Sequence, residues 1–484
     1  MSFFNMPSVR ASAALNLNHE LCRHLEIMRL AAPITGLQLA QIALTSIDLM
    51  MMGLLSVKAV AAGGLAVLLY NQLRTMCVGM VTGVGNLVAS AVARGERRTG
   101  TGDLDHQAEH EIADLLRAAM LIATLSAILG GALLLVVGLF LPWSRQEPAI
   151  VDLARPVMLA LMPGLFAMLW LNVLRQFAVG LRRAGSLLSV ALTSIGINAL
   201  LNALFIYGWF GVPRLGLTGI GLSTTLVQFW TLLTYLRTVR RDPQMSSLLA
   251  LDGWRAQSAT VGRIVRMGVP IALTYGSEAA LTSMATLFMG TFGPVALAAS
   301  NVVNQLAYIA YQFNIGLSHG ASILVSRMLA HGRHDEIGRI ARRALTISFT
   351  IMFLIGLLYA TFPQVVLFPF LGAQHNLVVI AEATTLLWFA IAHQFFKGAQ
   401  NILVGLLRGL GNTNGGLKNT SIGYWLIGIP GMLVCGYSLG WQGNGIWFGL
   451  CLSFAATSLL LARRFKVDIS TLRLWRDDHL PSDR

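Results

Sequence analysis

The chain has 484 residues, of which 55% are hydrophobic and 12% are charged, and its mean hydropathy is +0.66. A soluble globular chain carries roughly 25% charged residues, so this composition excludes a soluble fold and indicates a helical protein that crosses a membrane many times. The formal charge of +14 does not indicate nucleic-acid binding, because the excess of Lys and Arg lies between the apolar segments, as in loops that face the cytoplasm.

Twelve apolar segments each approach or exceed the roughly 20 residues that a membrane-spanning helix needs. They cover about 26–53, 60–92, 113–141, 151–181, 186–209, 216–238, 260–290, 295–330, 338–364, 376–408, 417–437 and 443–462. We therefore predict an all-α polytopic membrane protein. Its parts are an N-terminal segment (1–25), a six-helix bundle (26–239), a polar linker (240–258), a second six-helix bundle (259–463) and a tail (464–484).

Alternate loops of the predicted chain are basic. The loop after the second segment holds Arg94, Arg97 and Arg98, and the tail begins with Arg463 and Arg464, whereas loops on the other side hold few cations. By the positive-inside rule we expect both termini of this multi-pass protein in the cytoplasm; the resemblance described below implies the bacterial inner membrane.

The two halves are related by an internal repeat. The stretch PITGLQLAQIALTSIDLMMMG at 33–53 recurs as PIALTYGSEAALTSMATLFMG at 270–290, an offset of 237 residues, and the same offset pairs Gly79 with Gly316. Six spans in each half place the two repeats the same way up, related by an axis along the membrane normal. Two such pseudo-symmetric bundles are typical of a transporter with a cleft between them.

A carboxylate in the first segment, Asp48, is the strongest functional candidate. A charge inside the bilayer costs about 3 kcal/mol or more, which makes Asp48 a functional hypothesis by default. Asn198 and Asn202 share one helix face because they are four residues apart, and Thr224 lies in the next segment. These oxygens suit either a Na⁺ site or a proton-accepting acid; alternatively, the asparagines only bond neighbouring helices.

Glu278 and Lys397 form a second group of embedded charges. Lys397 lies eleven residues before Arg408, or about 16 Å along a helix axis, well inside the membrane. A cation at this depth needs a partner, and Glu278 from the same half is the obvious one. His393, one turn before Lys397, shares the predicted site. Whether the pair is functional or only locks the second bundle stays open.

Further polar residues are candidates for lining a substrate cleft. Arg74 could face that cleft, answer Asp48 electrostatically or extend along a tilted helix, and we favour the cleft. The predicted cleft residues are Gln41, Asn71, Arg74, Tyr308, Tyr311 and Gln312.

No catalytic constellation is found in the sequence. There is no Walker-type G-x-x-x-x-G-K-[ST] for ATP and no His/Cys/Asp grouping with metalloenzyme spacing. We therefore expect no enzyme and no cofactor, with H⁺ or Na⁺ as the coupling ion.

The order of several motifs resembles the multidrug and toxic compound extrusion (MATE) family, in its bacterial multidrug-efflux-like branch. The motifs are P…D-x-x-x-x-G at Pro33, Asp48 and Gly53, N-x-x-x-N at Asn198 and Asn202, GLSTT at 221–225, Glu278, and YWLIGIP at 424–430. Together they cover nearly the whole chain, about 26–462.

The resemblance implies a V-shaped fold, alternating access, and export of amphipathic, usually cationic, compounds in exchange for H⁺ or Na⁺. It assigns cation coupling, with Na⁺ as one possible occupant, to Asp48, Asn198, Asn202 and Thr224. Many bacterial members are expected to have a second cation site that uses a glutamate matching Glu278 and an aspartate. The aspartate's position is Lys397 here, so we hypothesise that the lysine ammonium replaces the bound cation.

The resemblance also sets the expected partners: a small amphipathic substrate and membrane lipids, no nucleic acid, and a monomeric protein. Three other readings are weaker. A flippase for lipid-linked oligosaccharides needs more deep cations than Arg74 and Lys397, and a major-facilitator carrier needs a signature loop that ARGERRTG does not match. A membrane scaffold or receptor leaves Asp48 and Glu278 unexplained.

Overall fold

The structure, a computed structural model, describes residues 9–100, 103–144, 148–183, 187–371 and 377–479, and this part of the chain is almost wholly helical. The helices of the first half and the linker are α1 (Val9–Leu55), α2 (Val57–Thr82), α3 (Val84–Thr99), α4 (His106–Phe140), α5 (Pro148–Gly180), α6 (Leu187–Tyr207), α7 (Gly216–Arg241) and α8 (Pro243–Ser246). Those of the second half are α9 (Ser258–Thr291), α10 (Pro294–Ala330), α11 (His334–Thr361), α12 (Pro363–Leu371), α13 (Leu377–Gly409), α14 (Thr413–Ser421), α15 (Ile429–Leu433) and α16 (Gln442–His479).

All twelve predicted segments coincide with helices in the described residues. The second segment is interrupted at Gly83, where α2 ends and α3 begins. The eleventh contains two π-helical stretches, Ile422–Gly428 and Val434–Ser438, on either side of α15. Eight of the described helices are long and apolar enough to cross a membrane by composition alone. The other four predicted segments are α7, α9, α10 and the interrupted eleventh, and they do not meet this criterion of length and composition.

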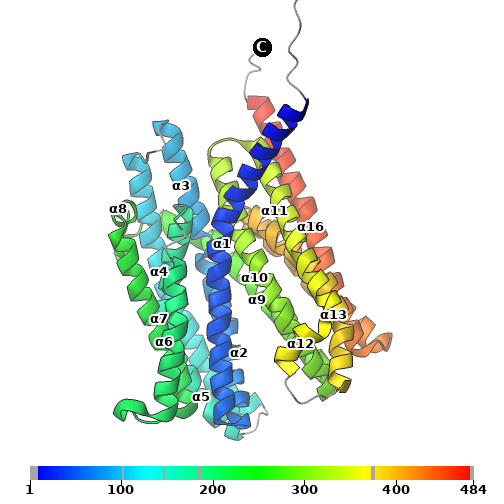
Figure 1. Ribbon diagram of the computed structural model, residues 1–484. Coiled ribbons are helices and arrows are strands. Elements are labelled where there is room, and N and C mark those ends of the chain that lie inside the picture. Colours follow the sequence, from blue (N-terminus) through cyan, green and yellow to red (C-terminus); the bar gives the residue numbers. More distant parts are fainter. Residues whose placement is uncertain (1–8, 101–102, 145–147, 184–186, 372–376, 480–484) are drawn as a thin grey trace, which may run out of the picture.

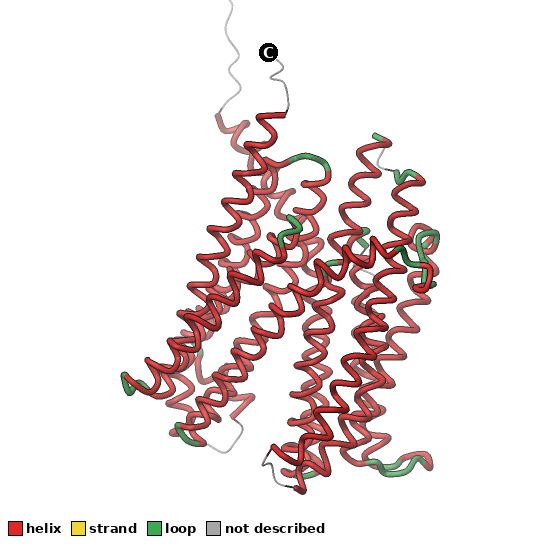
Figure 2. The backbone as a smooth tube through the Cα atoms, turned by 180° about the vertical axis from the view of Figure 1, so that it is seen from behind, coloured by secondary structure: helices red, strands yellow, loops and turns green. Residues whose placement is uncertain are grey.

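The helices form a V of two bundles, α1–α7 and α9–α16. The bundles meet near the end where the termini lie and diverge toward the opposite end (Figures 1 and 2). We call these the closed end and the open end. Helix α1 runs from the closed end to Leu55 at the open end (Figure 1). The predicted domain boundaries at 239 and 259 stay a prediction.

A short turn fixes the geometry of the closed end between α3 and α4. Asp105 caps α4 by accepting a hydrogen bond from the Ala108 amide. The Arg98 guanidinium donates to both Asp105 oxygens, at 2.6 and 2.9 Å. These bonds stabilise the charged carboxylate and lower the pKa of Asp105 to about 2, so the turn keeps its ion pair throughout the physiological pH range.

Polar side chains join the two bundles at the closed end. The Asn86 amide of α3 donates to the hydroxyls of Ser322 and Ser326 on α10, at 2.8 and 2.9 Å. All three residues are buried. Hydrogen-bonded groups lose little net free energy when water replaces their partners, so an interface of this kind is able to open and reclose.

An ion-pair cluster lies at the ends of α3 and α10. Glu96 of α3 accepts from the Arg327 guanidinium at 2.6 Å, and the His331 ring nitrogen lies 3.2 Å from the same carboxylate. Arg327 is buried, with 6% of its surface exposed. The cluster therefore adds a charged contact between the bundles beyond the Asn86 bonds.

The crossing of α2 and α9 brings the two backbones into direct contact. A side chain at Gly268 of α9 would collide with the Met80 carbonyl of α2, and one at Gly79 of α2 would collide with the Ala272 backbone. Small residues allow this close approach, which van der Waals contact stabilises in a membrane where no hydrophobic effect holds helices together.

The change Gly268→Ala tests this crossing. The added methyl group must push α2 away, and overpacking of this kind costs about 1–3 kcal/mol. We expect a lower apparent melting temperature of the detergent-solubilised protein, measured by fluorescence-detected size-exclusion chromatography. Gly262→Ala is the matched control, because a Cβ atom there meets nothing within 4 Å. Equal melting temperatures for both variants would show that the crossing is not tightly packed.

Candidate functional site

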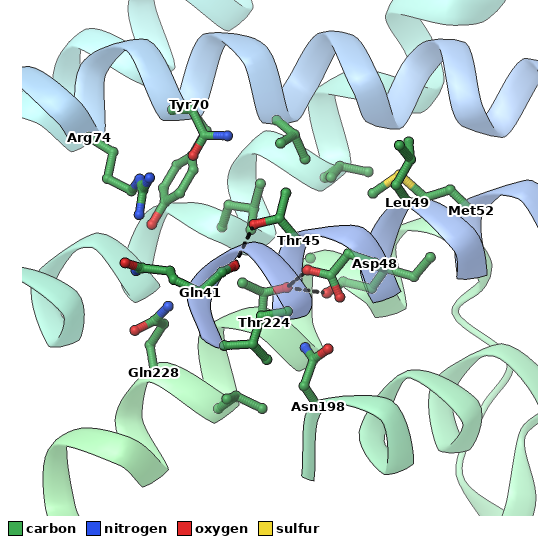
Figure 3. A pocket seen from close by; sticks show the side chains of 18 of the residues that line it. Gln41, Thr45, Asp48, Leu49, Met52, Tyr70, Arg74, Asn198, Thr224 and Gln228 are labelled. Atoms are coloured by element: carbon green, nitrogen blue, oxygen red, sulfur yellow. Dashed lines mark hydrogen bonds between the residues drawn. The ribbon is translucent and has the colours of Figure 1, made fainter. Parts of the chain in front are cut away.

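A cavity of about 160 Å³ lies inside the first bundle, between α1, α2, α5, α6 and α7 (Figure 3). Much of its wall is aliphatic, from residues such as Leu44, Val67 and Leu161. An engineered cavity of about 150 Å³ binds benzene, so this one has room for an aromatic group. The polar residues that line it are Gln41, Thr45, Asp48, Tyr70, Asn71, Arg74, Asn198, Thr224 and Gln228.

Asp48 of α1 lies at one end of this cavity and is held by two other helices. Its Oδ1 atom accepts a hydrogen bond from the Asn202 amide of α6 at 2.7 Å, and Oδ2 accepts one from the Thr224 hydroxyl of α7 at 2.9 Å. The side chain is 8% exposed. Two donors compensate part of the cost of burying the carboxylate, and they fix its position relative to α6 and α7.

The two asparagines of α6 lie on one face of the helix, beside the Asp48 carboxylate, as their four-residue spacing predicts. The Asn202 amide nitrogen also lies 3.3 Å from the Asn198 side-chain oxygen. Both residues are at most 1% exposed, yet Asn198 Nδ2 and Asn202 Oδ1 have no hydrogen-bond partner among the described residues. Buried polar atoms of this kind are normally satisfied. The Asn202 oxygen can accept from a donor or bind a cation, whereas the Asn198 nitrogen can only donate, to water or to an acceptor such as the Asp48 carboxylate.

The same oxygens can be tested for their fit to Na⁺. Carboxylate, amide and hydroxyl oxygens are hard ligands of the type that alkali and alkaline-earth cations prefer, and Asn202 Oδ1 is unpartnered. Both Asp48 oxygens, however, already face donor groups. Na⁺ would fit only after the Asn202 amide turns its oxygen toward Asp48, whereas a proton needs one free lone pair of the carboxylate. The geometry is therefore ready for a proton.

Three of the predicted cleft residues, Gln41, Asn71 and Arg74, line this cavity within the first bundle. Sequence reasoning missed Tyr70, Thr45 and Gln228. The missed signal is spacing: Gln228 lies one turn beyond Thr224 on α7, and Thr45 lies three residues before Asp48 on α1, so both share a face with a residue already chosen.

The other three predicted cleft residues lie elsewhere, on α10. Tyr308 is 46% exposed, and its carbonyl accepts a hydrogen bond from the buried Gln312 amide at 3.2 Å. Tyr311 packs against the charges of the second bundle. None of the three lines the cavity.

The embedded charges of the second bundle are paired. Lys397 Nζ of α13 lies 3.3 Å from Glu278 Oε1 of α9, and the two side chains are 13% and 14% exposed. The ammonium also lies 4.4 Å from the centre of the Tyr311 ring and 5.2 Å from that of Phe454. Carboxylate and ring faces together compensate the lysine charge.

His393 lies one turn from Lys397 but contacts aromatic rings. Its ring packs edge-on against Phe454, with centroids 4.8 Å apart, and against Trp447 at 5.9 Å. It is buried and forms no ion pair with Glu278 among the described contacts. His393 and Lys397 therefore contact the same ring, that of Phe454, and only Lys397 is paired with the carboxylate.

Neutralising Lys397 alone tests how the pair acts. Lys397→Met leaves the Glu278 carboxylate uncompensated, and breaking a buried pair costs about 3 kcal/mol or more. We expect Lys397→Met to lower membrane yield and transport more than the double variant Glu278→Gln/Lys397→Met does. Expression and thermal stability of the three proteins check this. If Lys397→Met loses no more membrane yield and thermal stability than the double variant does, a compensating role for the ammonium is refuted.

A protein-family model and the similar proteins that were found agree on one family. A protein-family model described as MatE matches residues 270–434. The chain is 35% identical to a probable multidrug resistance protein NorM of Pseudomonas aeruginosa, over 91% of this chain and 89% of that protein. It is 31% identical to a probable multidrug resistance protein NorM of Rhizobium meliloti, over 90% and 91% of the two chains.

Solved structures share the fold. One is described as the eukaryotic MATE transporter AtDTX14, with a TM-score of 0.80 and 17% identity over 93% of this chain and 98% of that one. Another is described as the outward-facing conformation of a multidrug resistance MATE family transporter, with a TM-score of 0.79 and 17% identity over 93% and 96%. At this level of identity the likeness concerns the fold alone.

Proposed function

The chain belongs to the multidrug and toxic compound extrusion (MATE) family of membrane transporters, and we propose that it exports amphipathic, cationic drugs or metabolites in exchange for H⁺. The observation that carries the proposal is Asp48: a buried acid, held by Asn202 and Thr224, in the wall of a cavity large enough for part of an organic ligand. The relatives named as multidrug resistance proteins support the substrate class.

The mechanism is competition at this cavity. Deprotonated Asp48 favours the substrate-bound state, because its negative charge attracts a cationic ligand. Protonation from the outside removes that charge, rearranges the contacts of α1 with α6 and α7, and expels the substrate. The proton can do this only by binding the two states with different affinity. Na⁺ is the second candidate for the coupling ion, and it would be held by Asp48, Asn198, Asn202 and Thr224.

We expect alternating access to act through the contacts between the two bundles. The closed end is held by hydrogen bonds and ion pairs of α3 with α10, and the basic residues Arg94, Arg97 and Arg98 lie on the last turns of α3. The positive-inside rule then makes the closed end cytoplasmic, so that the V opens outward and both termini lie in the cytoplasm. The inward-open state requires these contacts to break.

We further propose that the protein acts as a multi-pass carrier of the bacterial inner membrane and not as an enzyme. It needs no cofactor besides the coupling ion, works as a monomer surrounded by lipid, and binds no nucleic acid.

Asp48→Asn tests the coupling residue. The amide keeps the shape and accepts one of the two bonds through its oxygen, while its nitrogen can only donate; it cannot exchange a proton. We expect normal insertion in the membrane and loss of efflux driven by a pH gradient in proteoliposomes loaded with a fluorescent lipophilic cation. Asp114→Asn is the control, because this buried acid of α4 accepts a bond from the Gln257 backbone N–H and lies outside the cavity. Gradient-driven efflux that survives in Asp48→Asn would refute the assignment.

Efflux by the wild type separates the two coupling ions. If efflux occurs under a Na⁺ gradient alone and does not occur under a pH gradient, then Asp48, Asn198, Asn202 and Thr224 form a sodium site, and the proton proposal is contradicted.

Cross-linking tests alternating access. In a variant without the native cysteines, Glu96→Cys and His331→Cys place thiols on α3 and just after the C-terminal end of α10, where the tips of the native side chains lie 3.2 Å apart. A bifunctional methanethiosulfonate reagent bridges such thiols without the short Cα separation that a direct disulfide needs. The reagent should abolish efflux, and a reductant should restore it, because the closed end can no longer separate. The control pair Arg94→Cys/Glu111→Cys joins α3 and α4 within the first bundle and should keep its activity when cross-linked. Undiminished efflux from the cross-linked Glu96→Cys/His331→Cys variant would exclude this opening movement.

A further inference from the structure

A hollow of about 560 Å³ lies on the linker that joins the two bundles, outside the cavity that contains Asp48. We call it the linker hollow. Its walls come from α4, from the last turn of α7 and from linker residues between 246 and 254. Figure 1 shows α8, at the start of the linker, at the outer edge of the first bundle and toward the closed end. The proposed transport cycle assigns no role to this hollow.

One cation of the linker hollow has no partner. Arg117 of α4 donates to Asp252 at 2.8 Å, and this bond is the main cause of a lowered pKa of the Asp252 carboxyl, so that Asp252 stays charged and paired. The other acid of the linker, Asp242, pairs with Arg183 at 2.5 Å. Arg240 is exposed and forms no hydrogen bond or ion pair with any residue that the structure describes. The hollow therefore keeps a net positive charge, which suits an anionic group.

Trp254 in the wall of the hollow is 81% exposed, although the linker residues Met245 and Leu248 are buried. The position of Trp254 is fixed by its neighbour Gly253, where a Cβ atom would lie 3.2 Å from the backbone nitrogen of Leu121 on α4. Tryptophan is enriched where a membrane meets water, because its ring is apolar and its N–H group can bond to polar headgroups. We therefore expect the Trp254 ring to contact the membrane surface.

The lipid-facing surface of α4 begins one turn beyond this contact. Leu125, Ile128 and Leu129 are 55%, 64% and 71% exposed. They follow Leu121 by four, seven and eight residues and so lie on the same face of α4. An exposed apolar face of a membrane-spanning helix contacts lipid tails. Because Gly253 packs at Leu121, the linker hollow lies at the depth of the lipid headgroups.

We propose that the linker hollow binds the headgroup of an anionic phospholipid from the membrane leaflet at the closed end. Arg240 pairs with the phosphate, Trp254 lies between headgroup and tails, and the acyl chains lie along the apolar face of α4. Basic pockets beside membrane-spanning helices on the cytoplasmic side bind headgroups of this kind. The linker joins α7 to α9, so the bound lipid holds the connection between the bundles at the membrane surface.

Native mass spectrometry of the delipidated full-length protein tests the proposal. Dioleoylphosphatidylglycerol and dioleoylphosphatidylcholine are titrated separately, because they share their acyl chains and differ in net charge. We expect the wild type to bind dioleoylphosphatidylglycerol more tightly. Arg240→Gln should weaken that binding about fivefold, as for the removal of one basic residue near an anionic membrane surface. Binding of dioleoylphosphatidylcholine to Arg240→Gln should equal that of the wild type.

Arg241→Gln is the matched control. Arg241 lies on the same last turn of α7 and is exposed, but it does not line the linker hollow. This variant removes the same charge at the same depth and should bind dioleoylphosphatidylglycerol as the wild type does. Trp254→Ala should weaken the binding of both lipids, because the ring contacts a part that they share. All three side chains are exposed, so the variants should keep the melting temperature of the delipidated wild type.

Three outcomes would overturn the proposal: equal binding of the two lipids by the wild type, equal losses in Arg240→Gln and Arg241→Gln, or undiminished binding of both lipids by Trp254→Ala. Inorganic phosphate tests a soluble source of the same chemistry. The melting temperature of the wild type should rise with dioleoylphosphatidylglycerol and not with inorganic phosphate at the same concentration, and an equal rise with both would contradict a lipid site. These measurements use no gradient and no exported compound, so their result is independent of the proposed function.

Discussion

The cost of placing a charge inside a bilayer governs the organisation of this protein. Each embedded charge needs a compensating partner, and the partners come from other helices. Asp48 is compensated by Asn202 and Thr224, which fixes α1 against α6 and α7. Lys397 is compensated by Glu278 and by the Tyr311 ring, which joins α13 to α9 and α10. Arg74 lines the cavity together with Asp48, and no ion pair among the described residues includes it.

The two halves share a backbone plan but differ in how they use charge. In the first bundle the acid is hydrogen-bonded by uncharged donors, so its charge can change during a transport cycle without leaving a cation unpaired. In the second bundle the acid faces a permanent cation on a neighbouring helix. An ammonium covalently attached to α13 cannot exchange with ions in solution, and this difference directs the proposed coupling to Asp48.

The sequence predicted the twelve helical segments, the repeat and the grouping around Asp48, because composition and four-residue spacing report directly on spans and helix faces. It also predicted the partner of Lys397, since a deep cation leaves few choices. It did not place the cavity inside the first bundle, which Tyr308 of α10 does not line, and the cleft predicted between the bundles stays a prediction. The rotation of each helix about its axis decides such contacts, and it depends on packing partners such as Gly79 and Gly268 that only the assembled fold reveals.

Proton release on substrate binding tests the central claim of competition at Asp48 most directly. If protonation weakens substrate binding, substrate binding must release protons by the same coupling free energy. Adding a cationic substrate to the purified protein in weakly buffered solution, at a pH where Asp48 is protonated, should release up to about one proton per chain, detected with a pH indicator, and Asp48→Asn should release none. Saturable binding without proton release by the wild type, or equal release by Asp48→Asn, would contradict the account.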